Sequence, residues 1–172
     1  MTMYATVDSP LGVLLLVGEE TAGPVGAAAG VALVSLSLPG QKGAAVVQDG
    51  WLHHPAAFAG IAAQLREYFE GRRTGFDLVY ADGRGTDFQR RVWAALDGVP
   101  YGETVSYGQI AERVGSPGVG VRAVGTAIGR NPLLVVRPCH RVIGADGALR
   151  GYAGGLECKQ RLLGLEGALA VG

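Results

Sequence analysis

The chain has 172 residues, 48% of them hydrophobic, which is enough for the core of one medium domain or two small ones and argues against a disordered protein. Its 15 Lys and Arg residues balance 15 Asp and Glu residues, and a formal net charge of zero argues weakly against nucleic acid as a partner. The charge is unevenly spread, however: residues 1–85 carry 5 basic and 8 acidic side chains, whereas residues 86–172 carry 10 and 7. A polyanion would therefore meet the second half, although an ordinary solvated surface explains the same pattern.

Cysteine count and hydropathy exclude several protein classes. Cys139 and Cys158 are too few for a disulfide framework, and no Cys/His cluster has the spacing of a zinc site, so we predict neither a metal nor a cofactor. No basic leader precedes an apolar run, and the longest weakly polar stretch, residues 25–38, is too short to span a bilayer. We therefore predict a cytoplasmic protein in a reducing compartment, with free thiols and no membrane association.

The chain opens with the pattern of a β-sheet. Residues 3–8 and 13–17 are short apolar or β-branched runs on either side of a turn at 9–12, and this arrangement predicts a hairpin. Residues 30–38 alternate between apolar and small or polar side chains, which predicts a third strand.

One helix and a linker complete the first domain. Pro55 opens a helix whose apolar residues recur at helical spacing until Gly71 ends it, and residues 76–80 are a candidate further strand. Residues 82–86 have the composition of a linker. We therefore predict an N-terminal supporting domain of sheet plus helix at residues 1–82.

The remaining residues, 86–172, predict a mainly helical domain and hence an α+β protein. Capping boxes formed by Thr86 with Gln89 and by Ser106 with Gln109 each start a helix. After a stop at Gly115 and a turn at 116–118, a further helix runs from about 119 to 129. Helix, turn and helix together are the outline of a helix-turn-helix.

The end of the chain contains a candidate strand and a last helix. Residues 133–136 predict a short buried strand that leads into Pro138 and Cys139. A Gly-rich loop follows at 144–155, and a helix from 155 to 165 closes the chain. We expect its leucines to face inward: Leu156, Leu162, Leu163 and Leu165.

The stretch from Pro138 to Val142, PCHRV, carries the clearest chemical signal. Cys139 alone favours an inert core thiol, but His140 next to it supplies a candidate base, and the thiolate is the reactive form of cysteine. Glu166 could orient the imidazole, or it could be a solvated charge at the end of a helix. The sequence therefore indicates a nucleophilic thiol.

The helix at 119–129 is unusually rich in small residues. Its exposed face is expected to carry Ala123, Gly125, Thr126, Ala127 and Gly129. A reader of the major groove would carry Arg, Asn or Gln for base edges, so small residues favour close, sequence-independent docking in the minor groove. Arg122 could fill the space of an extruded base, or it could be a phosphate contact or a plain surface residue.

Several motifs of the second half occur together. They are PCHRVIG at 138–144, RAVG at 122–125, GRNP at 129–132, GYAGG at 151–155, FQ with VW at 88–93, and YGET leading to SY at 101–107. In combination they closely resemble the O6-alkylguanine-DNA alkyltransferases, the methylated-DNA–protein-cysteine methyltransferases. The resemblance is dense from about residue 86 to 167 and weaker from 1 to 85.

The resemblance implies a suicide reaction: direct DNA repair by irreversible transfer of an alkyl group from O6-alkylguanine to Cys139. It implies that His140, through a water molecule, and Glu166 generate the thiolate. Tyr107 would meet the phosphate of the flipped nucleotide and donate a proton as guanine leaves. Asn131 would tie the turn before the active-site segment to the recognition helix.

The resemblance also implies how the protein binds its substrate, duplex DNA that carries O6-alkylguanine. Arg122 would occupy the vacated stack, and the small residues Ala123 and Gly125 would lie in the minor groove. A loop and the backbone of the active-site segment would hold the flipped base, through Tyr152, Ala153, Gly154, Val142 and Cys139. We expect a monomer, with cooperativity on DNA left open.

Two departures from the family pattern stand out. Arg137 occupies the position before Pro138, where the family usually has an aliphatic residue, and residues 19–50 match the family poorly. The ligands for the zinc of some family members are absent from this chain. Two competing functions remain: a lesion-binding protein without catalysis, which needs no cysteine, and a cysteine hydrolase, which would turn over many times.

Overall fold

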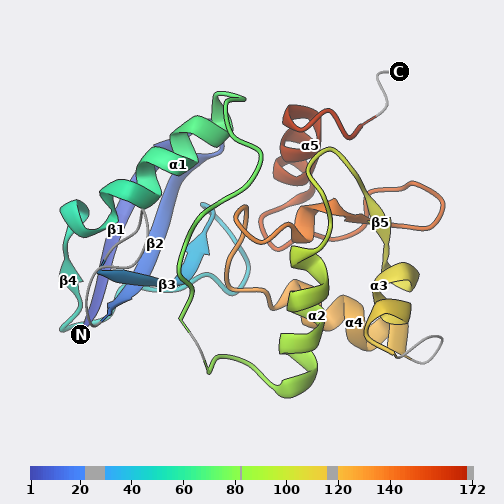
Figure 1. Cartoon of the computed structure of the whole chain (residues 1–172), viewed down its shortest axis with the longest axis horizontal. Coiled ribbons are helices and arrows are strands. Elements are labelled where there is room, and N and C mark those ends of the chain that lie inside the picture. Colours follow the sequence, from blue (N-terminus) through green and yellow to red (C-terminus); the bar gives the residue numbers. More distant parts are fainter. Residues whose placement is uncertain (22–29, 82, 116–119, 170–172) are drawn as a thin grey trace. The chain divides into compact units, whose positions relative to one another are not determined.

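The computed structural model describes residues 1–21, 30–81, 83–115 and 120–169 (Figure 1). The chain divides into two compact units, Met1–Gly83 and Arg84–Gly172. The first unit holds a four-stranded sheet with the strand order β3-β2-β1-β4, and helices dominate the second. The protein is therefore α+β, as predicted.

The predicted hairpin is confirmed. Strands β1 (Thr2–Ser9) and β2 (Gly12–Glu20) pair antiparallel from Thr2 opposite Glu19 to Ser9 opposite Gly12. Gly12 has a φ of +103°, which a residue with a side chain rarely adopts, and Ser9 Oγ donates a hydrogen bond of 2.7 Å to its carbonyl. The turn and the buried face of the two strands therefore fix their register together.

The other strands and the helix extend this hairpin. Strand β3 (Val31–Ser37) pairs antiparallel with β2, and β4 (Leu52–His53) pairs parallel with β1. A 3₁₀ turn, η2 (Pro55–Phe58), leads into α1 (Ala59–Phe69), which lies along the sheet in Figure 1. One side of this helical segment supplies core residues: Phe58, Ile61, Leu65 and Tyr68.

The predicted strand at 76–80 is wrong. Only Tyr80 forms a bridge, to Leu33, because the buried side chain of Gln64 takes both backbone groups of Asp77. Gln64 Oε1 accepts from the Asp77 N–H at 2.9 Å, and Gln64 Nε2 donates to the Asp77 carbonyl at 2.9 Å. The helix side chain thus takes the place of a strand partner at Asp77. Strand β3 pairs only with the end of the segment, where Leu33 donates to the Val79 carbonyl at 2.8 Å and accepts from the Ala81 N–H at 2.9 Å.

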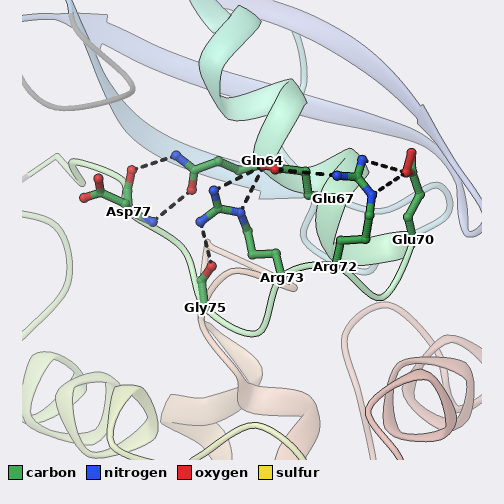
Figure 2. A network of polar contacts seen from close by, with 7 residues as sticks. All are labelled: Gln64, Glu67, Glu70, Arg72, Arg73, Gly75 and Asp77. Carbon is green, nitrogen blue, oxygen red and sulfur yellow. Dashed lines mark hydrogen bonds and ion pairs between the residues drawn. The ribbon is translucent and has the colours of Figure 1, made fainter.

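Polar contacts hold the segment after α1 to the helix (Figure 2). Gly71, with a φ of +77°, ends the helix, and the next N–H, that of Arg72, returns to the Glu67 carbonyl at 2.9 Å. Arg73 bonds both the Glu67 carboxylate, at 3.2 Å, and the Gly75 carbonyl, at 3.1 Å. The predicted stop at Gly71 is confirmed.

Both predicted capping boxes are present in the second unit. Helix α2 (Asp87–Asp97) begins after Thr86, and α3 (Tyr107–Arg113) begins after Ser106. Each cap oxygen accepts the N–H of a glutamine three residues on at 3.1 Å, and each glutamine bonds back to the cap N–H. Helix α4 (Gly120–Gly129) packs on α2 and α3, which completes the helix-turn-helix, while the predicted turn at 116–118 lies outside the described residues.

The predicted strand at 133–136 is also wrong. Val135 has a φ of +69°, in the left-handed region, and the N–H of Val136 donates to the Leu134 carbonyl at 2.8 Å. This tight γ-turn folds the chain back instead of extending it, although all four residues are buried as predicted. A β-branched residue in this conformation is strained, and its burial holds it there.

A short parallel pairing joins distant parts of the second unit. Strand β5 (Val105–Ser106) pairs with β6 (Val142–Ile143), which directly follows the 3₁₀ turn η3 (Cys139–Arg141). The pairing brings the start of α3 beside the segment that contains Cys139. The last helix, α5 (Leu156–Leu165), contacts η3. None of the helices in the described parts of the chain is long and apolar enough to cross a membrane.

Candidate active site

Cys139 lies in a tight turn at the start of η3. Its N–H donates to the Arg137 carbonyl at 2.8 Å across Pro138, and the N–H of Arg141 donates to the Pro138 carbonyl at 3.0 Å. The residue is 3% exposed, and burial raises the pKa of its thiol to about 11. Hydrogen bonding to Asn131 and the positive charges of Lys159 and Arg137 act in the opposite direction on this pKa.

His140 and Glu166 meet inside the second unit. His140 Nε2 lies 2.8 Å from Glu166 Oε2, and both side chains are fully buried. Burial lowers the pKa of His140, which favours the neutral imidazole. Since a carboxylate accepts but does not donate, Nε2 carries the proton, and Nδ1, which has no hydrogen-bond partner among the described residues, is left to accept one.

Arg141 fixes the same carboxylate from its other side. Its Nε donates to Glu166 Oε1 at 2.7 Å, and its Nη2 donates to Oε2 at 3.0 Å. Its Nη1 donates to the Val99 carbonyl at 2.6 Å, so the buried guanidinium is held by a carboxylate and a backbone group. This paired arrangement orients Glu166 toward His140.

Asn131 lies between the end of α4 and the active-site turn. Its N–H donates to the Ile128 carbonyl at 3.1 Å, its Oδ1 accepts from the Leu133 N–H at 3.0 Å, and its Nδ2 donates to the Leu133 carbonyl at 3.2 Å. Its side chain also acts to lower the pKa of the Cys139 thiol. Asn131 thus connects α4, the γ-turn and the thiol.

Tyr107 and Lys159 both interact electrostatically with the thiol. Burial raises the pKa of Tyr107, and the nearby Cys139 raises it further. Lys159 Nζ lies 5.9 Å from the centre of the Tyr107 ring and donates to the carbonyls of Val142, at 2.6 Å, and Gly151, at 3.2 Å. Burial lowers the pKa of Lys159 to about 8, so the amine is mostly charged at neutral pH.

Helix α4 presents the small residues singled out in the sequence. Arg122, Ala123 and Thr126 are exposed, and Gly125 is half-buried. A Cβ at Gly125 would lie 3.9 Å from Tyr107 Cδ1, so this part of the helix adjoins the active site. The expectation for Ala127 is wrong: it is 3% exposed and packs in the core, and its carbonyl accepts from Trp93 Nε1 at 2.9 Å.

The remaining predicted residues lie on the segments around Lys159. Tyr152, Ala153 and Gly154 are half-buried in the loop before α5, and the N–H of Gly155 donates to the Tyr152 carbonyl at 2.9 Å. The Val142 N–H donates to the Cys139 carbonyl. Each carbonyl of Cys139 and Val142 keeps a second lone pair with which a base edge could be bound.

Sequence reasoning missed two buried charged residues, Arg141 and Lys159. The pattern of α5 contained a signal for Lys159, because it lies three and four residues before the buried Leu162 and Leu163, on their face of the helix. Leu156, which we expected to face inward, is instead 48% exposed. No group of three or more His, Cys, Asp or Glu side chains within the described ranges could hold a metal ion.

The comparisons with known proteins agree with this geometry. Residues 87–168 match the DNA-binding domain of 6-O-methylguanine DNA methyltransferase, and residues 2–80 match the ribonuclease-like domain of the same family. A methylated-DNA–protein-cysteine methyltransferase of Mycolicibacterium paratuberculosis is 52% identical over 96% of this chain and 93% of its own length. One of Methanosarcina acetivorans is 44% identical over 96% of this chain and 98% of its own.

Solved structures lead to the same family. The crystal structure of Mycobacterium tuberculosis OGT in complex with DNA superposes with a TM-score of 0.82, at 46% identity, over 96% of this chain and 93% of that one. The chain therefore belongs to the 6-O-methylguanine DNA methyltransferase family, and its enzyme class is that of the methylated-DNA–protein-cysteine methyltransferases. It is a DNA-binding protein of DNA repair.

Proposed function

We propose that the protein repairs O6-alkylguanine in duplex DNA by a single transfer of the alkyl group to its own Cys139. The observation that carries this proposal is a buried thiol next to a histidine whose other nitrogen is held by a buried carboxylate. The thiol proton passes to Nδ1 of His140, through a bridging water, and Glu166 stabilises the imidazolium that forms. The reaction needs a free thiol, which agrees with a reducing, intracellular location.

In the transfer step, Cys139 Sγ attacks the alkyl carbon, and the S–C bond forms as the bond from carbon to O6 breaks. The electron pair of the broken bond goes to guanine, which takes a proton from Tyr107. The proton that His140 received restores Tyr107, so charge and protons balance. The product thioether has no route back to a thiol, and each molecule acts once.

DNA would bind through α4 and the loop before α5. Arg122 is exposed at the start of α4, and Ala123 and Gly125 leave room for a close approach, so we propose docking in the minor groove without sequence preference. Arg122 would fill the stack from which the guanine is flipped. Tyr152, Ala153 and Gly154 would enclose the flipped base, and the protein would act as a monomer.

Mass measurement of the intact protein and of its peptides tests the proposal. After incubation with a duplex that contains O6-methylguanine, the wild-type protein should gain one methyl group, on the peptide with Cys139. Cys139→Ser should bind the same duplex and gain nothing, whereas Cys158→Ser, at a half-buried thiol outside the site, should react like the wild type. Transfer by Cys139→Ser, or repeated turnover, would refute the assignment.

A further inference from the structure

Arg137 is a charged residue in an otherwise apolar stretch of the active-site segment. The four residues before it, 133–136, are all buried and aliphatic, and Pro138 and Cys139 follow it. The Arg137 side chain is itself only 13% exposed. The cost of burying a guanidinium requires partners at its polar atoms, so its contacts are informative.

The guanidinium of Arg137 lies between α2 and Asn131. Its Nε donates to Asp97 Oδ1 at 3.3 Å, and its Cζ lies over the Trp93 ring, 5.4 Å from the ring centre. Its Nη1 reaches Asn131 Oδ1 at 3.5 Å. Trp93 Nε1 donates to the Ala127 carbonyl, so the guanidinium makes its cation–π contact with a ring that is itself anchored.

Asn131 connects this guanidinium to the thiol. Its Oδ1 accepts from the Leu133 N–H at 3.0 Å and from Arg137 Nη1 at 3.5 Å, and its Nδ2 donates to the Leu133 carbonyl at 3.2 Å. The same side chain and the charge of Arg137 both act to lower the pKa of the Cys139 thiol, whose N–H donates to the Arg137 carbonyl at 2.8 Å. A positive charge at the oxygen of an amide polarises it and makes its N–H a stronger donor. A stronger donor at sulfur favours the thiolate over the thiol.

Asp97 acts against this effect. Its carboxylate, 47% exposed at the end of α2, offsets part of the guanidinium charge that Asn131 and the thiol experience. The side chains of Arg137 and Asp97 therefore influence the thiol with opposite signs, through one shared contact.

We propose that Arg137 is a positioning residue for the alkyl transfer: through Asn131 it stabilises the Cys139 thiolate, and Asp97 sets how strongly it does so. The inference rests on the proposed function, since the thiolate is the nucleophile of that reaction. It assigns a role to a residue that departs from the aliphatic pattern of the family.

Other ionisable groups around the thiol are the same in every variant of the test. Tyr107 from α3 and Lys159 from α5 interact electrostatically with the thiol, and His140 is the next residue in η3. A shift between variants therefore reports the Arg137–Asp97 pair.

The experiment measures the rate at which iodoacetamide alkylates Cys139 as a function of pH, without DNA, by peptide mass. Cys158 in the same sample is the internal reference, because the charged residues that act on its thiol are Glu157 and Arg161, which no variant changes. Arg137→Met keeps the volume and removes the charge, so the rate at neutral pH should fall about threefold to tenfold and the profile should move to higher pH. Asp97→Asn keeps an acceptor for Arg137 and removes the opposing charge, so its profile should move to lower pH.

The double variant completes the test. In the Arg137→Met background, Asp97→Asn should no longer move the pH profile of alkylation to lower pH, because the effect of Asp97 on the thiol passes through the guanidinium. Shifts of the same sign in the two single variants, or no shift in a folded Arg137→Met protein, would overturn the proposal. If Arg137→Met does not fold, Arg137→Lys replaces it, because lysine keeps the positive charge but not the planar guanidinium. The pH profile of Arg137→Lys should lie between that of the wild type and that expected for Arg137→Met. A profile at the pH of the wild-type profile or at lower pH overturns the proposal.

Methyl transfer from O6-methylguanine is measured separately on the wild type. Absence of transfer there would contradict the proposed function, while the iodoacetamide profiles would still decide the role of Arg137. The two failures are therefore distinguishable.

Discussion

Replacing Glu166 by glutamine should destabilise the second unit strongly. The carboxylate bonds His140 at 2.8 Å and Arg141 at 2.7 and 3.0 Å, and its side chain has no exposed surface. An amide can accept only at its oxygen, and its NH₂ would face the guanidinium of Arg141, which is 8% exposed and would lose its counter-charge. Breaking a buried pair in this way costs about 3–5 kcal/mol.

Urea unfolding followed by the fluorescence of Trp93 measures this loss. A Trp51→Phe background leaves Trp93, which is buried on α2, as the reporter of the second unit. Glu157→Gln on the same helix α5 is the matched control: Glu157 is exposed, and its replacement should change the free energy of unfolding by no more than about 0.5 kcal/mol. Alkyl transfer by Glu166→Gln should also slow, by about 100-fold, because the imidazole loses its orienting carboxylate.

A loss below about 1 kcal/mol would refute this reasoning, since that is the scale of an exposed ion pair. Such a result would mean that water reaches Arg141 or that the segment around Glu166 rearranges. A large loss of stability with an unchanged transfer rate would instead separate the structural role of Glu166 from the proposed catalytic one.

Three further predictions concern pH, DNA docking and the first unit. Burial lowers the pKa of His140, so below about pH 6.5 the unfolded chain binds more protons than the folded one. The stability of the second unit should therefore fall as the pH falls from 7 toward 5.5. His140→Gln should flatten this pH dependence, and an equal slope in both proteins would contradict the prediction. Gly125→Leu should fold normally but bind duplex DNA at least about tenfold more weakly, because its side chain would fill the face that we propose enters the minor groove. Gly125→Ala should lose less DNA affinity. Equal affinities of the variants and the wild type in a fluorescence anisotropy titration would exclude this docking face. Gln64→Leu should lower the free energy of unfolding of the first unit by about 2 kcal/mol, because both backbone groups of Asp77 lose their partner. Trp51 fluorescence in a Trp93→Phe background reports this unfolding, and a change under about 0.5 kcal/mol would show that water replaces the amide.

Local sequence signals predicted the elements that local interactions form. The hairpin at Ser9 and Gly12 and the caps at Thr86 and Ser106 each depend on residues no more than three positions apart, and all were correct. The helix stop at Gly71 is of the same kind. When interacting residues are so close in sequence, their residue types determine the local conformation.

The two incorrect strands failed because distant residues decide their conformation. Gln64 lies 13 residues from Asp77 and takes its backbone groups, which no pattern within 76–80 indicates. Val135 adopts a φ of +69° that its own side chain disfavours, and only the surrounding packing imposes it. Propensity predicted β structure at both places, and tertiary contacts changed the outcome.

The candidate site was predictable in its residues but not in all of its connections. The motif around Cys139 indicated a thiol, a base and a possible carboxylate, and the structure brings His140 and Glu166 to 2.8 Å. Arg141 bonds the same carboxylate twice, although 25 residues separate Arg141 from Glu166 in the sequence. Arg137 and Asp97, which also bond each other, are 40 residues apart. Such pairs leave no periodic signal in the chain.

The depth of Cys139 in the fold has a consequence for the lifetime of the unused protein. Burial raises the pKa of the Cys139 thiol to about 11, so the thiol and not the thiolate predominates at neutral pH, and the residue is 3% exposed. Soluble oxidants and stray electrophiles react with accessible thiolates, and a protein that we propose reacts only once would be lost at each such encounter. The same burial that makes the resting thiol a poor nucleophile thus preserves its single reaction for the alkylated base.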